Sequence, residues 1–246
     1  MYLLLSGEGI SDMGRCQVDE KCEPPSFQAG AMAIMVDQLI EIIQGYEFSY
    51  LDNLRVTYVS ESYLAEHNPK LKSARKMALP SKDIPQETRY YFQNARALAI
   101  IAKELSQQIN DIVIAVLFRD ADGTASAGRG NWQNKYNSMK NGFAVESYDF
   151  GVPMMPNTKS EAWLLCAVKN NYQHCINLEG IKGNDDSLNS LKSQLAASLQ
   201  GDANASKLAE LVKDKVVDVR RIDMPSFNQF RQDLEQAIHL AHQQSY

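Results

Sequence analysis

The feature that most constrains the fold is the apolar run IVIAVLF at Ile112–Phe118, the most continuous one in the chain. Strands of a parallel sheet are buried on both faces, so they read as near-continuous hydrophobic runs rather than as alternating patterns. This run therefore predicts a central parallel strand. Parallel strands are joined by crossover connections, usually helices that cover the faces of the sheet. We expect an α/β fold.

Strand and helix patterns alternate over most of the chain. β-branched and aromatic residues favour strands, and apolar residues at intervals of three and four favour helices. Strands are predicted at 2–5, Leu54–Val59, Ile112–Phe118 and Phe143–Tyr148. Helices are predicted at Ala29–Ile43 and Gln86–Ile109, around Trp132–Met139 and at Ser160–Lys169, with a loop between Asp12 and Phe27. The alternation favours a parallel sheet flanked by helices.

The last third of the chain carries a different pattern. From about residue 172 onward only helices are predicted, at Leu188–Leu199, Lys207–Lys215 and Ser226–Gln243. The residues Gly201–Ser206 form a linker between the first two. We therefore expect an α/β domain at 1–170 and a helical C-terminal appendage at 171–246.

Bulk composition narrows the function classes. The formal net charge of −5 argues against a protein that coats DNA through overall positive potential, although an acidic metal site would itself contribute negative charge. No apolar run reaches the roughly 18 to 20 residues of a membrane span, and no signal-peptide core follows Met1, so a cytoplasmic location is expected. The four cysteines lack CxxC spacing, and we expect reduced thiols.

Two acidic clusters follow predicted strands directly. Glu8 and Asp12 come after the first strand, and Asp120 and Asp122 come after the central one. If these strands are neighbours, the four carboxylates converge at one edge of the sheet, where ligands of open α/β sheets bind. Clustered carboxylates repel one another unless a cation neutralises them, and hard oxygen ligands suit Mg²⁺ or Mn²⁺. The alternative is that Asp120 and Asp122 only form a turn.

The same residues carry a resemblance to a known family. GEGISD at Gly7–Asp12 and RDADG at Arg119–Gly123, each behind an apolar strand, resemble the Toprim domain of topoisomerases, primases and OLD-type nucleases. KSEAWLLC at Lys159–Cys166 is similar to the acidic helix start of small stand-alone Toprim-like proteins of bacterial defence systems. The resemblance covers roughly residues 1–170. It implies a Rossmannoid sheet, and it leaves the loop at 13–27 and the C-terminal helices unmatched.

The resemblance also implies an activity. It indicates metal-dependent cleavage of DNA or RNA, in which two Mg²⁺ ions activate water and stabilise the departing oxygen. Glu8 would be a metal ligand or the general base, and Asp12, Asp120, Asp122 and Glu161 would be metal ligands. Lys159 or Arg119 would supply positive charge to the phosphorus, although a surface charge or a structural ion pair explains either cation equally well. Antiviral defence with an OLD-like ATPase partner is implied on family grounds, and a homo-oligomer is compatible with the sequence.

Two rival interpretations stay open. VLFRDADGTA resembles the first motif of haloacid-dehalogenase-type phosphatases, in which Asp120 would be the nucleophile and Asp122 the acid/base. The residues Gly183–Asp186 are similar to the late acidic motif of that family, but its first motif normally opens the domain, whereas here more than a hundred residues precede it. The second rival is a non-catalytic module that binds a metal or nucleotide while its helical tail docks a partner.

A basic cluster is the best candidate for nucleic-acid contacts. Five cations occur in a short segment without an acid, and counterion release rewards such clusters. They are Lys70, Lys72, Arg75, Lys76 and Lys82. A solvated basic loop or helix is the alternative. Tyr90 and Tyr91 follow closely, either to stack on bases or, more commonly for such residues, to pack in the core.

Overall fold

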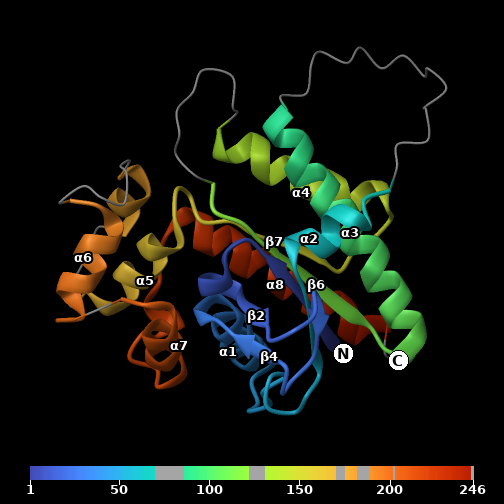
Figure 1. Ribbon diagram of the computed structural model, residues 1–246, viewed down its shortest axis with the longest axis horizontal. Coiled ribbons are helices and arrows are strands. Elements are labelled where there is room, and N and C mark those ends of the chain that lie inside the picture. The colour runs from blue at the N-terminus through green and yellow to red at the C-terminus, as the bar shows by residue number, and fades with distance from the viewer. Residues whose placement is uncertain (70–85, 122–130, 170–174, 182–188, 202, 245–246) are drawn as a thin grey trace.

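Strand β1 (Tyr2–Gly7) lies at the centre of a five-stranded sheet of order β3-β5-β1-β6-β7. The computed structural model in Figure 1 describes residues 1–69, 86–121, 131–169, 175–181, 189–201 and 203–244. The other strands are β3 (Lys21–Cys22), β5 (Val56–Val59), β6 (Val113–Phe118) and β7 (Gly151–Met154). β5, β1, β6 and β7 are parallel, and β3 is an antiparallel edge strand. The α/β class predicted from the sequence is confirmed.

Alternate residues of β1 point to opposite faces of the sheet, as the pleat requires. Leu3 and Leu5 belong to one hydrophobic core and Leu4 to the other. The helices of the first face are α1 (Ala31–Gln44), α5 (Ser160–Val168), α6 (Leu191–Ser198), α7 (Ala205–Lys213) and α8 (Pro225–Gln244). The helices of the second face are α2 (Glu61–Glu66), α3 (Gln86–Ile109) and α4 (Trp132–Val145). The sheet is therefore the middle of three layers.

The prediction of a strand at Phe143–Tyr148 was wrong. Helix α4 continues to Val145, and the strand, β7, begins at Gly151. Phe143 prolongs the buried stripe of Tyr136 and Met139 that packs on α3. Gly142 makes close packing possible, because a Cβ there would lie 2.5 Å from the carbonyl oxygen of Phe92. Helix packing thus outweighs the strand-favouring residues of this segment.

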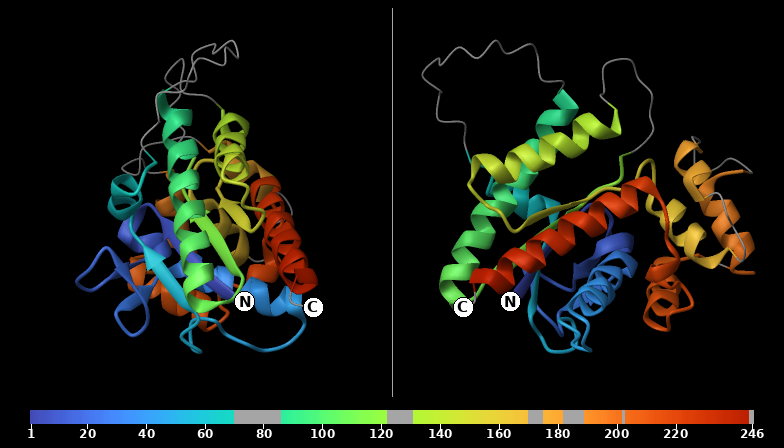
Figure 2. Two further views of the ribbon diagram at one scale, coloured as in Figure 1. Left: turned by 90° about the vertical axis from the view of Figure 1, so that its right-hand side faces the viewer. Right: turned by 180° about the vertical axis from the view of Figure 1, so that it is seen from behind.

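The C-terminal region is helical, but it is not an appendage. Helix α8 packs along β7 and against α1, as Figure 2 shows. Phe227 and Phe230 surround the fully buried Trp163 of α5, with ring centroids 5.1 and 5.9 Å from its own. The last helix therefore completes one layer of the domain that the sequence had placed within 1–170.

The expectation of reduced cysteines was also wrong. Cys16 is bonded to Cys22, and Cys166 to Cys175. The predicted loop after Asp12 contains β2 (Gly14–Cys16) and β4 (Phe27–Ala29), which pair with each other, besides β3. The Cα atoms of the two pairs lie 5.7 and 5.4 Å apart, within the range that a disulfide spans.

Among the described residues, no helix has the length and apolar character that a membrane crossing needs.

Asp37 is a buried carboxylate on α1 and makes stability depend on pH. It accepts hydrogen bonds from the Ser49 hydroxyl and the Tyr50 amide, each at 2.7 Å. Burial outweighs these bonds and raises the pKa of Asp37 from 3.8 to about 6. Because the folded-state pKa lies above the unfolded one, the stability linked to this group is present below about pH 4 and is lost as the pH rises through 6.

The variant Asp37→Asn is expected to remove this dependence. Relative to the variant, the wild type should lose about 3 kcal/mol of unfolding free energy between about pH 4 and pH 7. Urea unfolding at a series of pH values measures the difference. Asp52→Asn, which changes an exposed carboxylate in the turn after α1, is the matched control. Parallel pH profiles of the wild type and Asp37→Asn would contradict the prediction.

Candidate functional site

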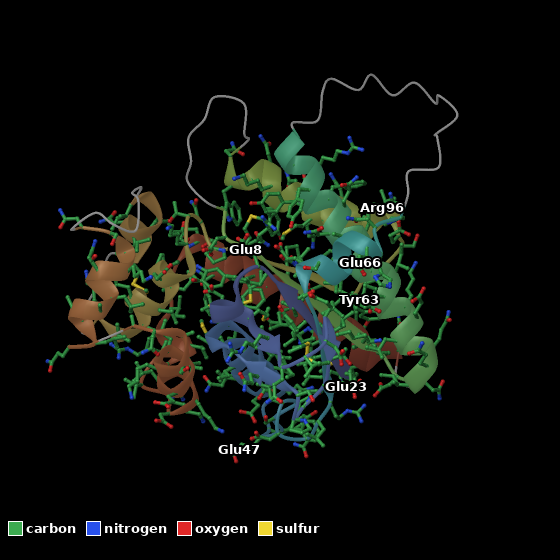
Figure 3. All side chains as sticks on the ribbon, viewed as in Figure 1. Glu8, Glu23, Glu47, Tyr63, Glu66 and Arg96 are labelled. Atoms are coloured by element: carbon green, nitrogen blue, oxygen red, sulfur yellow. A yellow bond between two sulfur atoms is a disulfide. The ribbon has the colours of Figure 1, made fainter. Side chains whose placement is uncertain are left out.

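The two acidic motifs leave the sheet side by side. β1 and β6 are neighbours, and their last paired residues are Gly7 and Phe118. A Cβ at Gly7 would lie 2.9 Å from that of Phe118, so glycine permits the close approach. Glu8, labelled in Figure 3, turns back so that its Oε1 accepts a hydrogen bond of 2.7 Å from the amide of Asp120. The ends of β1 and β6 therefore lie together, as predicted.

Asp12 is linked to Asp120 through Ser160. Asp12 lies in a π-helical turn (Gly9–Met13), and the first residue of this turn, Gly9, has a positive φ. Its Oδ1 accepts a hydrogen bond of 2.6 Å from the Ser160 hydroxyl. The Ser160 amide donates in turn to Oδ1 of Asp120 at 2.9 Å. Ser160, which is almost fully buried, thus fixes two of the predicted metal ligands relative to each other.

Arg119 is held between two carboxylates. Its guanidinium lies 3.0 Å from Oε2 of Glu8 and also forms an ion pair with Glu61 of α2. It stacks over the ring of Tyr90 at 4.1 Å, and the Tyr90 hydroxyl donates to Glu61. Burial opposes the charge of Arg119, but Glu8 and Glu61 outweigh it and raise the pKa of the guanidinium above its usual range. Arg119 is thus a permanent cation that orients Glu8.

Buried side chains hold the chain just after β6. The Tyr91 hydroxyl donates to the carbonyl of Asp120 at 3.1 Å, and Lys135 donates to the carbonyl of Ala121 at 2.6 Å. Both side chains are only 3% exposed. Tyr91 is therefore a core residue, whereas Tyr90 lies at the edge of the ion-pair network. Such contacts keep the backbone of Asp120 in place.

Lys159 and Glu161 flank Ser160 at the start of α5. Lys159 is the N-cap residue, with an extended backbone, and Glu161 is in the first turn. Glu161 and Asp12 line a cleft of about 340 Å³ that continues toward α6 and α7. The structure therefore links Glu8 directly to Asp120 and links Asp12 to Asp120 through Ser160, and Glu161 lines the same cleft as Asp12.

Several predicted site residues lie outside the described residues. Asp122 is one, and the whole basic cluster is another: Lys70, Lys72, Arg75, Lys76 and Lys82. The whole late acidic segment 183–186 also lies outside. Within the described ranges, no group of three or more His, Cys, Asp or Glu side chains is arranged to hold a metal ion.

The donors at the rim nevertheless have the chemistry of a hard-cation site. By the rim we mean Glu8, Asp12, Asp120 and Ser160, which offer carboxylate and hydroxyl oxygens. Mg²⁺ and Mn²⁺ prefer such oxygens, whereas zinc sites favour Cys and His. Both nearby disulfides exclude the cysteines from metal binding, because a disulfide sulfur is not a thiolate. The residues present therefore fit a hard divalent cation in kind.

Sequence reasoning missed Ser160 and Glu61 as residues of this site, and it named Tyr90 only as a residue that stacks on bases or packs in the core. Ser160, Glu61 and Tyr90 connect to the acidic motifs only through tertiary contacts. One signal was visible, since Ser160 begins a predicted helix within the KSEAWLLC segment, and serine is common at helix starts. Comparison of the chain with family models, with curated proteins and with solved structures found no match.

Proposed function

We propose that this protein is a metal-dependent nuclease of the Toprim type, which hydrolyses phosphodiester bonds of DNA or RNA with Mg²⁺ or Mn²⁺. The observation that carries the proposal is the hydrogen bond from the Asp120 amide to the Glu8 carboxylate. It joins the side chain of the acid that follows β1 to the backbone of the acid that follows β6.

The chain's own residues have distinct tasks in this proposal. Asp12 and Asp120 would hold the cation, at positions that Ser160 fixes by one hydrogen bond to each. Arg119 and Glu61 keep the Glu8 carboxylate directed at the rim, where it would accept a proton from the attacking water. When bound, the cation supplies an activated water and stabilises the departing oxygen. The predicted roles of Asp122, Lys159 and Glu161 remain part of this proposal.

An OLD-like ATPase partner and a role in antiviral defence belong to the same proposal. They rest on the resemblance of the two acidic motifs and of KSEAWLLC. A phosphatase of the haloacid-dehalogenase type gives Glu8 no task, whereas in the nuclease the Glu8 carboxylate, paired with Arg119, belongs to the site. The nuclease is therefore the function we put forward.

The purified wild type tests the proposal directly. It should be assayed on single- and double-stranded DNA, on RNA and on a generic phosphomonoester, with Mg²⁺ or Mn²⁺ and with EDTA. Cleavage of at least one polynucleotide is expected, abolished by EDTA and restored by excess Mn²⁺. Turnover of the phosphomonoester alone, or no cleavage of any polynucleotide, would overturn the proposed function.

A further inference from the structure

The cleft beside the rim has polar and apolar lining residues. The polar ones are Asp12, Ser160 and Glu161, together with Lys192 of α6 and Asn204. The apolar ones are Leu164 and Leu208, together with alanines. Ligand sites are typically of this kind, with a volume of roughly 300 to 1,000 Å³, apolar walls and a few convergent polar groups.

The far wall of the cleft is anchored to the rest of the fold. Leu195 of α6 and Val212 of α7 are fully buried in the core that covers the first face of the sheet. The Gln38 side chain of α1 donates a hydrogen bond of 2.8 Å to the Val212 carbonyl. α6 and α7 therefore stand at a defined distance from Asp12, and the cleft is a preformed feature.

The positive charge of Lys192 does not stabilise its own helix. It occupies the first turn of α6, where the helix dipole disfavours a positive charge, and its side chain is exposed. It lines the same cleft as the carboxylates of Asp12 and Glu161. Its position thus suits a negatively charged group of a ligand that also reaches the rim.

We propose that this cleft binds one nucleotide of a single-stranded polynucleotide, next to the bond that is cut, with Lys192 holding its phosphate. The inference rests on the proposed function, to which it adds a substrate class. The rim takes the scissile phosphate, Lys192 takes the next phosphate along the strand, and the apolar walls contact the sugar and base. A cleft of about 340 Å³ lies in the size range of sites for small ligands, which includes a single nucleotide.

Two variants test the cleft, each with a matched control. Lys192→Ala removes the cation, and Ala196→Phe fills the cleft from α6. Lys213→Ala and Ala197→Phe make the same changes at exposed positions outside the cleft lining. Thermal unfolding checks that all four variants fold.

The readouts are the kinetics on a short single-stranded oligonucleotide and its affinity in EDTA, measured by fluorescence anisotropy. Lys192→Ala and Ala196→Phe are expected to raise KM and Kd about tenfold and to change kcat less than twofold, because one charged contact or one filled site is lost. Lys192→Ala should also lower the slope of log Kd against log salt by about 0.7, which a structural role would not do. A duplex of the same sequence should bind more weakly than the single strand.

The outcomes separate this inference from the proposed function. If the wild type cleaves but both variants match their controls, or if the duplex binds as tightly as the single strand, the cleft proposal is wrong and the nuclease stands. If nothing is cleaved but the two variants weaken oligonucleotide binding, the cleft proposal stands and the nuclease is wrong. A wild type that neither cleaves nor binds polynucleotides overturns both.

Discussion

Replacing Glu8 by Gln is expected to lower polynucleotide cleavage by about 10²- to 10⁴-fold with little change in fold. The Gln side chain keeps an oxygen that can accept the hydrogen bond from the Asp120 amide. It loses the negative charge that pairs with Arg119 at 3.0 Å, and it can neither accept a proton efficiently nor act as a strong metal ligand. The rate on the preferred polynucleotide with Mn²⁺ is the measurement.

The control for this variant is Glu66→Gln on α2, which changes an exposed glutamate labelled in Figure 3. It should cleave at the wild-type rate. A phosphatase of the haloacid-dehalogenase type predicts a different pattern, because the acid after its first strand has no task and Asp120 forms a phosphoryl-enzyme intermediate. Phosphomonoester turnover that survives Glu8→Gln, with phosphate trapped on Asp120, would establish that alternative.

The variant Asp120→Asn should reduce cleavage to the background rate while the protein stays folded. The Asn side-chain oxygen can still accept from the Ser160 amide, so the link between the end of β6 and the start of α5 is retained. What disappears is a charge beside Asp12, and removing one of two like charges relieves repulsion in the metal-free protein. The unfolding midpoint should therefore stay at or above the wild-type value.

Calorimetric binding of Mn²⁺ distinguishes a metal ligand from a turn former at this position. Weaker Mn²⁺ binding with an unchanged unfolding midpoint is expected for Asp120→Asn. A lower midpoint with unchanged Mn²⁺ binding would mean that Asp120 only shapes the turn. Asp149→Asn, an exposed change just before β7, is the control and should behave as the wild type.

Three strands of the sheet, β5, β1 and β6, could be predicted from the sequence because their signals are local. The apolar run of β6 and the acids that follow β1 and β6 are each contiguous, and the rule that ligands bind beyond parallel strand ends places them together. Helix α3 was also recognisable, since its apolar stripe is long. Where periodicity was ambiguous the prediction failed, as at Phe143, whose burial against α3 prolongs a helix instead of forming a strand.

Tertiary contacts could not be predicted in the same way. Glu61 meets Arg119 only because α2 follows β5, and β5 pairs with β1. The pattern of α8 predicted a helix, but nothing in it specified that Phe227 and Phe230 enclose Trp163. An apolar stripe predicts that one face of a helix is buried. Which residues cover that face depends on the packing of the whole chain.

The bond between Cys166 and Cys175 has a consequence for how the protein matures. Helix α5 begins at the serine that both Asp12 and Asp120 contact, and it reaches Cys166 two turns later. The disulfide therefore ties the helix that carries the rim to the chain beyond Cys175. Reducing compartments keep cysteines as free thiols, and oxidising compartments favour disulfide bonds. The redox conditions under which the chain is made or purified thus decide whether this covalent link to the helix of Ser160 exists.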